Sequence, residues 1–246
     1  MAFGIPTIWI GAFMGICLIP ILRGGIRRIS RLSEIVVPFM SIAYVVIALI
    51  VIGSNISKLP ETFIMILDSA FGTNAVFGGV VGADIEMGVK RGIYSNEAGQ
   101  GSQVPAAEVS HPAKQGLVQA SSIYIDTLLI NTSTDLMILL SGMYNVIAPS
   151  GEILHNGLLG VSTGSAVTIA AIDTVLPGLG SAIIAIAIFF FAYTIFFSNY
   201  YVAETNLVYL TKGKQTAIQI WIMQIAYATM IFLGAIESSE LSWVVS

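Results

Sequence analysis

The sequence has very little charge, a single cysteine and no block of basic residues. Charged residues make up 10% of its 246 residues and apolar residues 56%, whereas soluble domains carry about 25% charged residues. A surface so poor in charge could not be kept in water. The single cysteine, Cys17, excludes an internal disulfide. The scattered Lys and Arg residues argue against a nucleic acid as the partner.

Long apolar runs fill most of the chain. A membrane-spanning helix needs about 20 mostly apolar residues. We therefore predict an all-α integral membrane protein with about six transmembrane helices in a single membrane domain. No basic segment precedes the first apolar run, so we expect no cleavable signal peptide. The predicted spans are residues 5–22, 35–53, 63–89, 117–146, 179–210 and 217–236, with a short surface helix within 161–176.

The basic residues support this layout independently. Of the ten Lys and Arg residues, nine fall in the first, third and fifth connections between spans, and only Lys58 falls in the second. Because short cytoplasmic loops collect Lys and Arg, the odd-numbered connections are predicted to be cytoplasmic. The C-terminal tail is then predicted to lie outside.

Small residues interrupt the third predicted span. Gly72, Gly78, Gly79 and Gly82 loosen a helix and let another backbone approach closely. Many secondary transporters bind substrate carboxylates and cations at helices that are broken at mid-membrane. Close packing between helices, without any ligand, is the alternative explanation of these glycines.

Polar side chains form a stripe on the fourth predicted span. Asp126 lies well inside the span, and Thr127, Asn131, Thr134 and Asp135 share one face at helical spacing. A charge at the centre of a spanning helix costs about 2.5–3.5 kcal/mol on insertion scales, so such an acid is a functional candidate. Hydrogen bonding between helices explains this stripe at least as well as contact with a ligand.

The fifth predicted span carries hydroxyl groups and one acid. Thr194, Ser198 and Tyr201 follow a helical spacing of four and three residues. Their oxygen atoms suit a hard cation such as Na+, although Tyr201 also fits the aromatic belt at the membrane interface. Glu204 lies near the inner end of this span, where its side chain would either reach the interface or pair with a basic residue.

The most distinctive segment follows the third span on the predicted cytoplasmic side. Residues 91–102 read RGIYSNEAGQGS, with Glu97 at the centre. Ser95 or Asn96 is predicted to cap a short helix, and Gly99 permits a tight turn. Physical reasoning alone predicts a capped, glycine-rich loop of unknown purpose.

An enzyme is a remote alternative. Asp84 and Asp126 lie in segments faintly like those of an intramembrane aspartyl protease, which needs two carboxylates that share one proton. The motifs stand in the wrong order, and the chain has neither an HExxH motif nor a Ser–His–Asp arrangement. His111 and His155 are predicted on opposite sides of the membrane, which argues against a shared metal site. We therefore predict that the protein is not an enzyme.

Several motifs together resemble the alanine or glycine:cation symporter family, also called sodium:alanine symporters or amino acid carrier proteins. They occur in the family's order over about residues 23–210. The motifs are VPFM at 37–40, RGIYSNEAGQGS at 91–102, HP at 111–112, QGLV at 115–118, IDT at 125–127 and FAYTIFFSNYYVAE at 191–204. One departure is Ile195, where family members often have a small hydroxyl residue.

The resemblance implies a LeuT-like fold, in which two inverted repeats contain five helices each. The six spans would be helices four to nine of that core, and the third span would be the broken first helix of the second repeat. The residues that would contact the amino acid are Phe77, Gly78, Gly79, Gly82 and Asn199.

The ion site implied by the resemblance lies on the fifth span. Thr194 and Ser198 would contribute oxygen ligands to a sodium ion, and no other cofactor is expected. The departure at Ile195 weakens an assignment of this site from the motif alone.

The implied function is sodium-coupled symport of a small neutral amino acid, alanine or glycine, across the plasma membrane. The first broken helix of the fold has no match in this sequence. We therefore expect a fragment, a truncated product or one part of a split carrier, which needs a missing N-terminal half and does not transport alone. The alternatives are a non-transporting membrane subunit or scaffold, and a channel. A channel would not need a binding site that is built from two paired halves.

Overall fold

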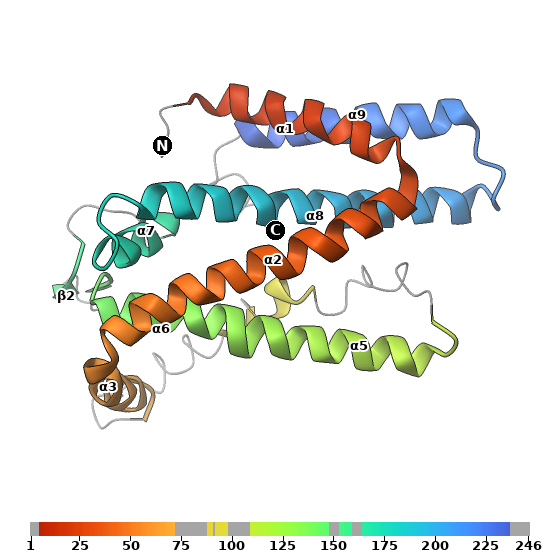
Figure 1. Cartoon of the computed structure of the whole chain (residues 1–246). Coiled ribbons are helices and arrows are strands. Elements are labelled where there is room, and N and C mark those ends of the chain that lie inside the picture. The colour runs from red at the N-terminus through yellow and green to blue at the C-terminus, as the bar shows by residue number, and fades with distance from the viewer. Residues whose placement is uncertain are drawn as a thin grey trace. The chain divides into compact units, whose positions relative to one another are not determined.

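Helices make up most of the described part of the chain (Figure 1). The computed structural model describes residues 5–71, 88–90, 92–97, 109–147, 153–158 and 164–236. The α-helices are α1 (Thr7–Leu22), α2 (Gly25–Ser54), α3 (Leu59–Phe71), α5 (Pro112–Ile125), α6 (Thr132–Ser141), α7 (Ser165–Asp173), α8 (Gly180–Leu210) and α9 (Ala217–Ile236). The other elements are the 3-10 turn η1 (Ile56–Lys58), the π-helical turn η3 (Asp126–Asn131) and the strands β1 (Asn145–Ile147) and β2 (Ile153–Asn156).

Four helices in the described ranges are long and apolar enough to cross a membrane. They cover Arg31–Ser54, Pro112–Ser141, Gly180–Leu210 and Ala217–Ala235, and Ile8–Leu22 is a shorter apolar helix. Many of their large apolar side chains are exposed, as a lipid-facing surface requires. The third predicted span is described only as far as Phe71, and residues 72–87 lie outside the described part.

Helix α2 begins earlier than the predicted span at residue 35. It starts at Gly25, so Arg31 belongs to the helix rather than to a loop. A search for about 20 consecutive apolar residues finds only the part of a helix that lies in the membrane. The polar residues that extend the helix are missed, although they form a helix equally well. Pro20 in α1 and Pro38 in α2 are both accommodated inside a helix, as spanning helices often allow.

The fourth predicted span extends further than the helix does. Helix α6 ends at Ser141, and Gly142 adopts the left-handed conformation with φ 73°, which is a common way to end a helix. The chain then forms a small antiparallel hairpin, in which Asn145 pairs with Asn156. This hairpin is a β element in a chain for which we predicted helices alone.

Side chains hold the hairpin together and join it to α3. The amide of Asn145 donates to the Leu158 carbonyl at 2.8 Å and accepts from the Leu158 N–H at 3.0 Å. The Tyr144 ring stacks on His155 with ring centroids 4.2 Å apart, and its hydroxyl donates to the sulfur of Met65 at 3.2 Å. These contacts fix the position of the hairpin on the end of α6.

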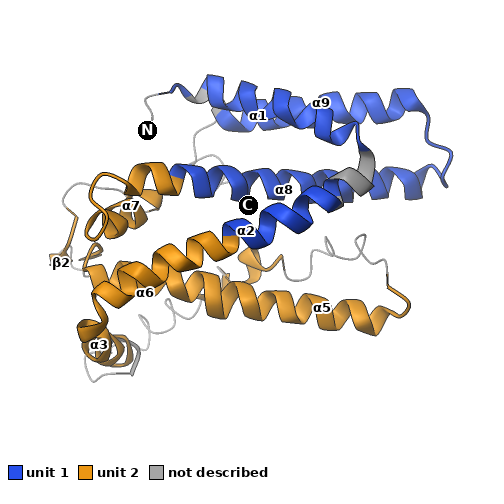
Figure 2. Ribbon diagram, in the orientation of Figure 1, with its two compact units in different colours: residues 1–40, 103–107, 185–246 blue, residues 41–102, 108–184 orange. Residues whose placement is uncertain are grey.

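The chain divides into two compact units (Figure 2). Unit 1 comprises Met1–Met40, Gln103–Ala107 and Ala185–Ser246, and unit 2 comprises Ser41–Ser102 and Glu108–Ile184. The division falls within α2 and within α8, so each of these helices belongs partly to both units.

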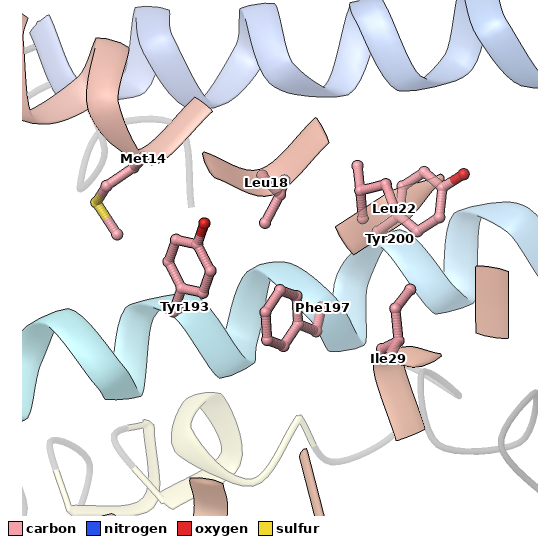
Figure 3. Packing of buried hydrophobic residues seen from close by; sticks show 7 residues of the cluster. All are labelled: Met14, Leu18, Leu22, Ile29, Tyr193, Phe197 and Tyr200. Carbon is pink, nitrogen blue, oxygen red and sulfur yellow. The ribbon is translucent and has the colours of Figure 1, made fainter. Parts of the chain in front are cut away.

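The core of unit 1 is a stripe of side chains shared by α1 and α8 (Figure 3). Positions four or three residues apart lie on one helix face, so each helix contributes a continuous row. The buried residues are Met14, Leu18 and Leu22 of α1, Ile29 of α2, and Tyr193, Phe197 and Tyr200 of α8. Met223, Tyr227 and Ile231 of α9 pack against this cluster.

Polar contacts also join α9 to its neighbours within unit 1. The Tyr227 hydroxyl donates to the Phe196 carbonyl at 2.8 Å. The Arg23 guanidinium at the end of α1 lies 4.5 Å from the centre of the Trp221 ring, which is a favourable cation–π distance. Interhelical bonds of this kind fix the rotation of α9 about its axis.

Small residues let α1 and α9 approach each other closely. The two helices lie side by side in Figure 1. A Cβ atom added at Gly11 would lie 2.6 Å from the Cβ of Ala235, and one added at Gly15 would lie 3.6 Å from the Ala228 carbonyl. Glycines four residues apart are a common basis for close helix packing in membranes.

We predict that Gly11→Ile separates α1 from α9 and destabilises unit 1 by about 1–3 kcal/mol, the usual cost of overpacking. Thermal unfolding in detergent measures this loss. Gly234→Ile is the matched control, because a Cβ at Gly234 meets no atom within 4 Å. Equal losses in both variants would contradict the close-packing explanation.

Hydrogen bonds connect the helices of unit 2. The hydroxyls of Tyr44 in α2 and Thr134 in α6 lie 2.6 Å apart. Lys58 donates from Nζ to the Leu140 carbonyl at 3.3 Å. The Asp173 carboxylate at the end of α7 accepts from the N–H groups of Gly178 at 3.0 Å and Gly180 at 2.8 Å, and so caps the start of α8.

We predict that Tyr44→Phe destabilises the protein by about 0.6 kcal/mol and by no more than about 1.7 kcal/mol, the measured range for hydrogen bonds between spanning helices. A double-mutant cycle with Thr134→Val should recover this value as the coupling energy. Tyr124→Phe is the control, since Tyr124 is 66% exposed. A coupling energy of zero would show that the bond contributes nothing.

Candidate functional site

The residues predicted to contact the substrate lie mostly beyond the described ranges. Phe77, Gly78, Gly79 and Gly82 all fall within residues 72–87. Their role therefore stays a prediction. Asn199, the fifth member of that group, lies on α8, where its side chain is exposed.

The predicted ion ligands lie one turn apart on α8. Thr194 is half-buried, and its hydroxyl donates to the Phe191 carbonyl at 2.8 Å. Ser198 is exposed and follows four residues later, on the same face. Because the Thr194 proton is used within the helix, the lone pairs of its oxygen remain available. The oxygens of Thr194 and Ser198 therefore have the right chemistry for Na+, but two oxygens alone do not complete a coordination shell.

The distinctive loop segment forms a short helical turn that is capped at its C-terminal end. The side chain of Asn96 donates to the Gly92 carbonyl at 2.9 Å, and the Ser95 hydroxyl donates to the same oxygen at 3.5 Å. Glu97 adopts a left-handed conformation with φ 49°, which ends the turn. Ser95 and Asn96 therefore cap the C-terminal end of this turn and not its N-terminal end. Gly99 lies outside the described residues.

A π-helical turn interrupts the polar stripe of the fourth span. The turn covers Asp126–Asn131, and the Thr132 hydroxyl donates to the Thr127 carbonyl five residues earlier at 3.0 Å. Asn131 donates from Nδ2 to the carboxylate of Asp126 at 3.4 Å. The extra residue of a π turn places Asn131 beside Asp126, whereas α-helical spacing placed it beside Thr127. Such turns occur frequently at functional sites.

Hydroxyl groups further along the fourth span find partners within the protein. The hydroxyls of Ser133 and Thr134 donate to the Leu129 and Ile130 carbonyls at 2.5 and 3.0 Å. Thr134 also meets Tyr44 of α2, while Asp135 is exposed. Thr134 therefore makes the interhelical contact that was the alternative explanation of the stripe.

Glu204 belongs to a polar cluster that the sequence did not reveal. Gln224 of α9 donates from Nε2 to the Tyr200 hydroxyl at 3.1 Å, and Glu204 follows Tyr200 by one turn on the same face of α8. Tyr200 is fully buried, and Gln224 is 6% exposed. The spacing of Tyr200 and Glu204 could have indicated their shared face, but nothing in the sequence pairs either of them with Gln224.

The described part of the chain contains no cluster of side chains that would bind a transition metal. No three His, Cys, Asp or Glu residues lie together there. The hydroxyl and carbonyl oxygens on α8 are instead the donors that a hard monovalent cation prefers.

A comparison with known families decides between these possibilities. The whole chain, residues 1–246, matches the model of the sodium:alanine symporter family. The chain belongs to this family. The resemblance drawn from the sequence motifs is confirmed, and the family consists of transporters rather than enzymes. With its apolar helices, this member of the family is a multi-pass membrane protein.

Curated relatives of this chain come from bacteria and archaea. It is 48% identical over 246 residues to a sodium/proton-dependent alanine carrier protein of Bacillus sp. strain PS3, covering 98% of this chain and 55% of the relative. It is 34% identical over 246 residues to the sodium/alanine symporter AgcS of Methanococcus maripaludis, covering 98% and 51%. The chain thus spans about half the length of these relatives. No solved structure matches it.

We predict that Asp126→Leu leaves the Asn131 amide without its partner and costs up to about 1 kcal/mol of stability. Asp126→Asn is the matched variant, because its amide oxygen still accepts the bond from Asn131. Thermal unfolding in detergent, with the Asn131→Leu single and double variants, measures the coupling. Equal destabilisation by both Asp126 variants would contradict this role.

Proposed function

We propose that this chain takes part in sodium-coupled symport of alanine across the plasma membrane. The observation that carries the proposal is the match of the whole chain to the sodium:alanine symporter family. The helices long enough to span a membrane and the oxygen atoms on α8 are consistent with it.

Alanine is the first candidate for the substrate. The relative from Bacillus sp. strain PS3 is named an alanine carrier and is 48% identical, whereas the probable sodium/glutamine symporter GlnT of Bacillus subtilis is 37% identical. Glycine remains a candidate from the sequence resemblance. A glutamine side chain is much larger than that of alanine or glycine, so size should separate these substrates in competition experiments.

We propose a LeuT-like arrangement of two inverted repeats for the complete carrier. In this proposal the third span is the broken helix, and Phe77, Gly78, Gly79 and Gly82 contact the amino acid together with Asn199. Broken helices present unpaired backbone groups to carboxylates and cations. The C-terminal tail of the chain is proposed to lie outside, as the basic connections indicate.

Thr194 and Ser198 are proposed to bind the coupling sodium ion. Their spacing of four residues supports a shared face, and the intrahelical bond of Thr194 fixes its oxygen in one rotamer. A sodium gradient drives symport only when sodium and the amino acid bind to the carrier in a coupled way. If sodium raises the affinity for alanine by some factor, alanine raises the affinity for sodium by the same factor, because coupling between two binding sites is reciprocal.

The experiment that tests the proposal is uptake of labelled alanine by proteoliposomes with and without an inward sodium gradient. Two preparations are compared: the chain by itself, and the chain extended to the length of its relatives. Sodium-driven uptake by either preparation supports symport. If neither preparation shows uptake although both are inserted and folded, the result would favour a non-transporting subunit or scaffold.

We predict that Thr194→Val and Ser198→Ala each raise the sodium concentration for half-maximal uptake roughly tenfold, which corresponds to about 1.4 kcal/mol of binding free energy. The matched control is Thr229→Val on α9, because Thr229 is exposed and its hydroxyl donates within the helix to the Ile225 carbonyl at 2.8 Å. An unchanged sodium dependence in both α8 variants would rule these residues out as ligands.

A further inference from the structure

We propose that Glu204 is a proton-binding site of the carrier, with the proton carried on Oε2 of its carboxyl group. The inference deepens the proposed function, on which it rests, by naming a residue that would take up a proton.

The Glu204 carboxyl lies one helical turn beyond a buried polar pair. Gln224 of α9 donates from Nε2 to the Tyr200 hydroxyl at 3.1 Å, and Tyr200 precedes Glu204 by four residues on α8. The Oε2 atom of Glu204 is buried and has no hydrogen-bond partner among the described residues. This oxygen is therefore shielded from water and left without a described donor.

A bare carboxylate oxygen at this position is costly. Glu204 lies within Gly180–Leu210, one of the candidate membrane spans. A buried polar atom without a partner costs about 1–3 kcal/mol, and more when it is charged. A proton taken from water onto Oε2 removes the negative charge without any change in packing.

The neighbouring elements offer no described donor to Oε2. On α9, the Tyr227 hydroxyl already donates to the Phe196 carbonyl. At the end of α1, the Arg23 guanidinium stacks on Trp221. Beyond the end of α8, Lys212 and Lys214 are exposed.

Helix α2 supplies the remaining charged groups to consider. Its residue Ile29 packs in the same core as Tyr200, and Arg27 and Arg28 precede Ile29 in the sequence. An ion pair from either arginine would keep Glu204 charged. The experiment below therefore includes both residues.

Infrared spectroscopy tests the inference directly, without any need for transport. The protein, reconstituted in lipid at neutral pH, should show the carbonyl band of a protonated carboxyl group, which shifts in heavy water. Glu204→Gln should remove this band, and Glu61→Gln should leave it unchanged, because Glu61 is exposed in the first turn of α3. A band that persists in Glu204→Gln would overturn the proposal, and so would a wild-type protein without the band.

Two further variants separate a proton from an ion pair. Arg27→Gln and Arg28→Gln should leave the band unchanged. If instead the band appears only in one of the arginine variants, Glu204 is an ion-pair partner and the proposal fails. Gel filtration of each variant checks that it is folded.

Uptake measurements connect this site to transport. Glu204→Gln resembles the protonated form, so its sodium-driven alanine uptake should vary less than twofold from mildly acidic to mildly alkaline pH, while the wild type loses uptake at the alkaline end. An unchanged pH profile in Glu204→Gln would overturn a role in transport. Absence of uptake in every variant, with the infrared band behaving as expected, would reject the proposed symport and leave the proton site intact.

Discussion

Every polar group inside a membrane has to find a partner within the protein, and this constraint shapes the helices of this chain. Hydroxyl side chains donate repeatedly to carbonyls one turn earlier, as Thr62 does to Lys58 at 3.0 Å and Thr205 to Tyr201 at 2.9 Å. These bonds let a polar residue lie in an apolar helix at little cost. Where a group is left over, it joins two helices, as Tyr227 does with the Phe196 carbonyl.

Packing in the two units follows different rules. In unit 1, α1 and α9 meet through small residues, and the larger residues of α1 face α8. A small-residue contact permits close approach of the two helix backbones. Unit 2 relies more on hydrogen bonds, with Tyr44 and Lys58 each reaching α6 from another element. Such directional bonds specify one relative rotation of the helices.

The apolar pattern was enough to place whole helices but not their local exceptions. The predicted span 217–236 and helix α9 cover the same residues, because hydrophobic length is the dominant signal there. The hairpin after Gly142 was missed, since its stability comes from Asn145 and from the Tyr144–His155 stack rather than from alternation. The bond from Gln224 to the Tyr200 hydroxyl joins two helices, and one sequence contains no signal for such a pairing. The family could be recognised from the sequence because each of its motifs is a short run of consecutive residues.

The π turn at Asp126–Asn131 also affects how this chain should be aligned with other sequences. One additional residue in a helix rotates everything beyond it by about 100°, since an α-helix has 3.6 residues per turn. A relative that lacks the turn would need one residue fewer to place the same side chains on the same faces. A single-residue gap within this segment would therefore preserve the structure, whereas an ungapped alignment would pair residues from different faces of α6.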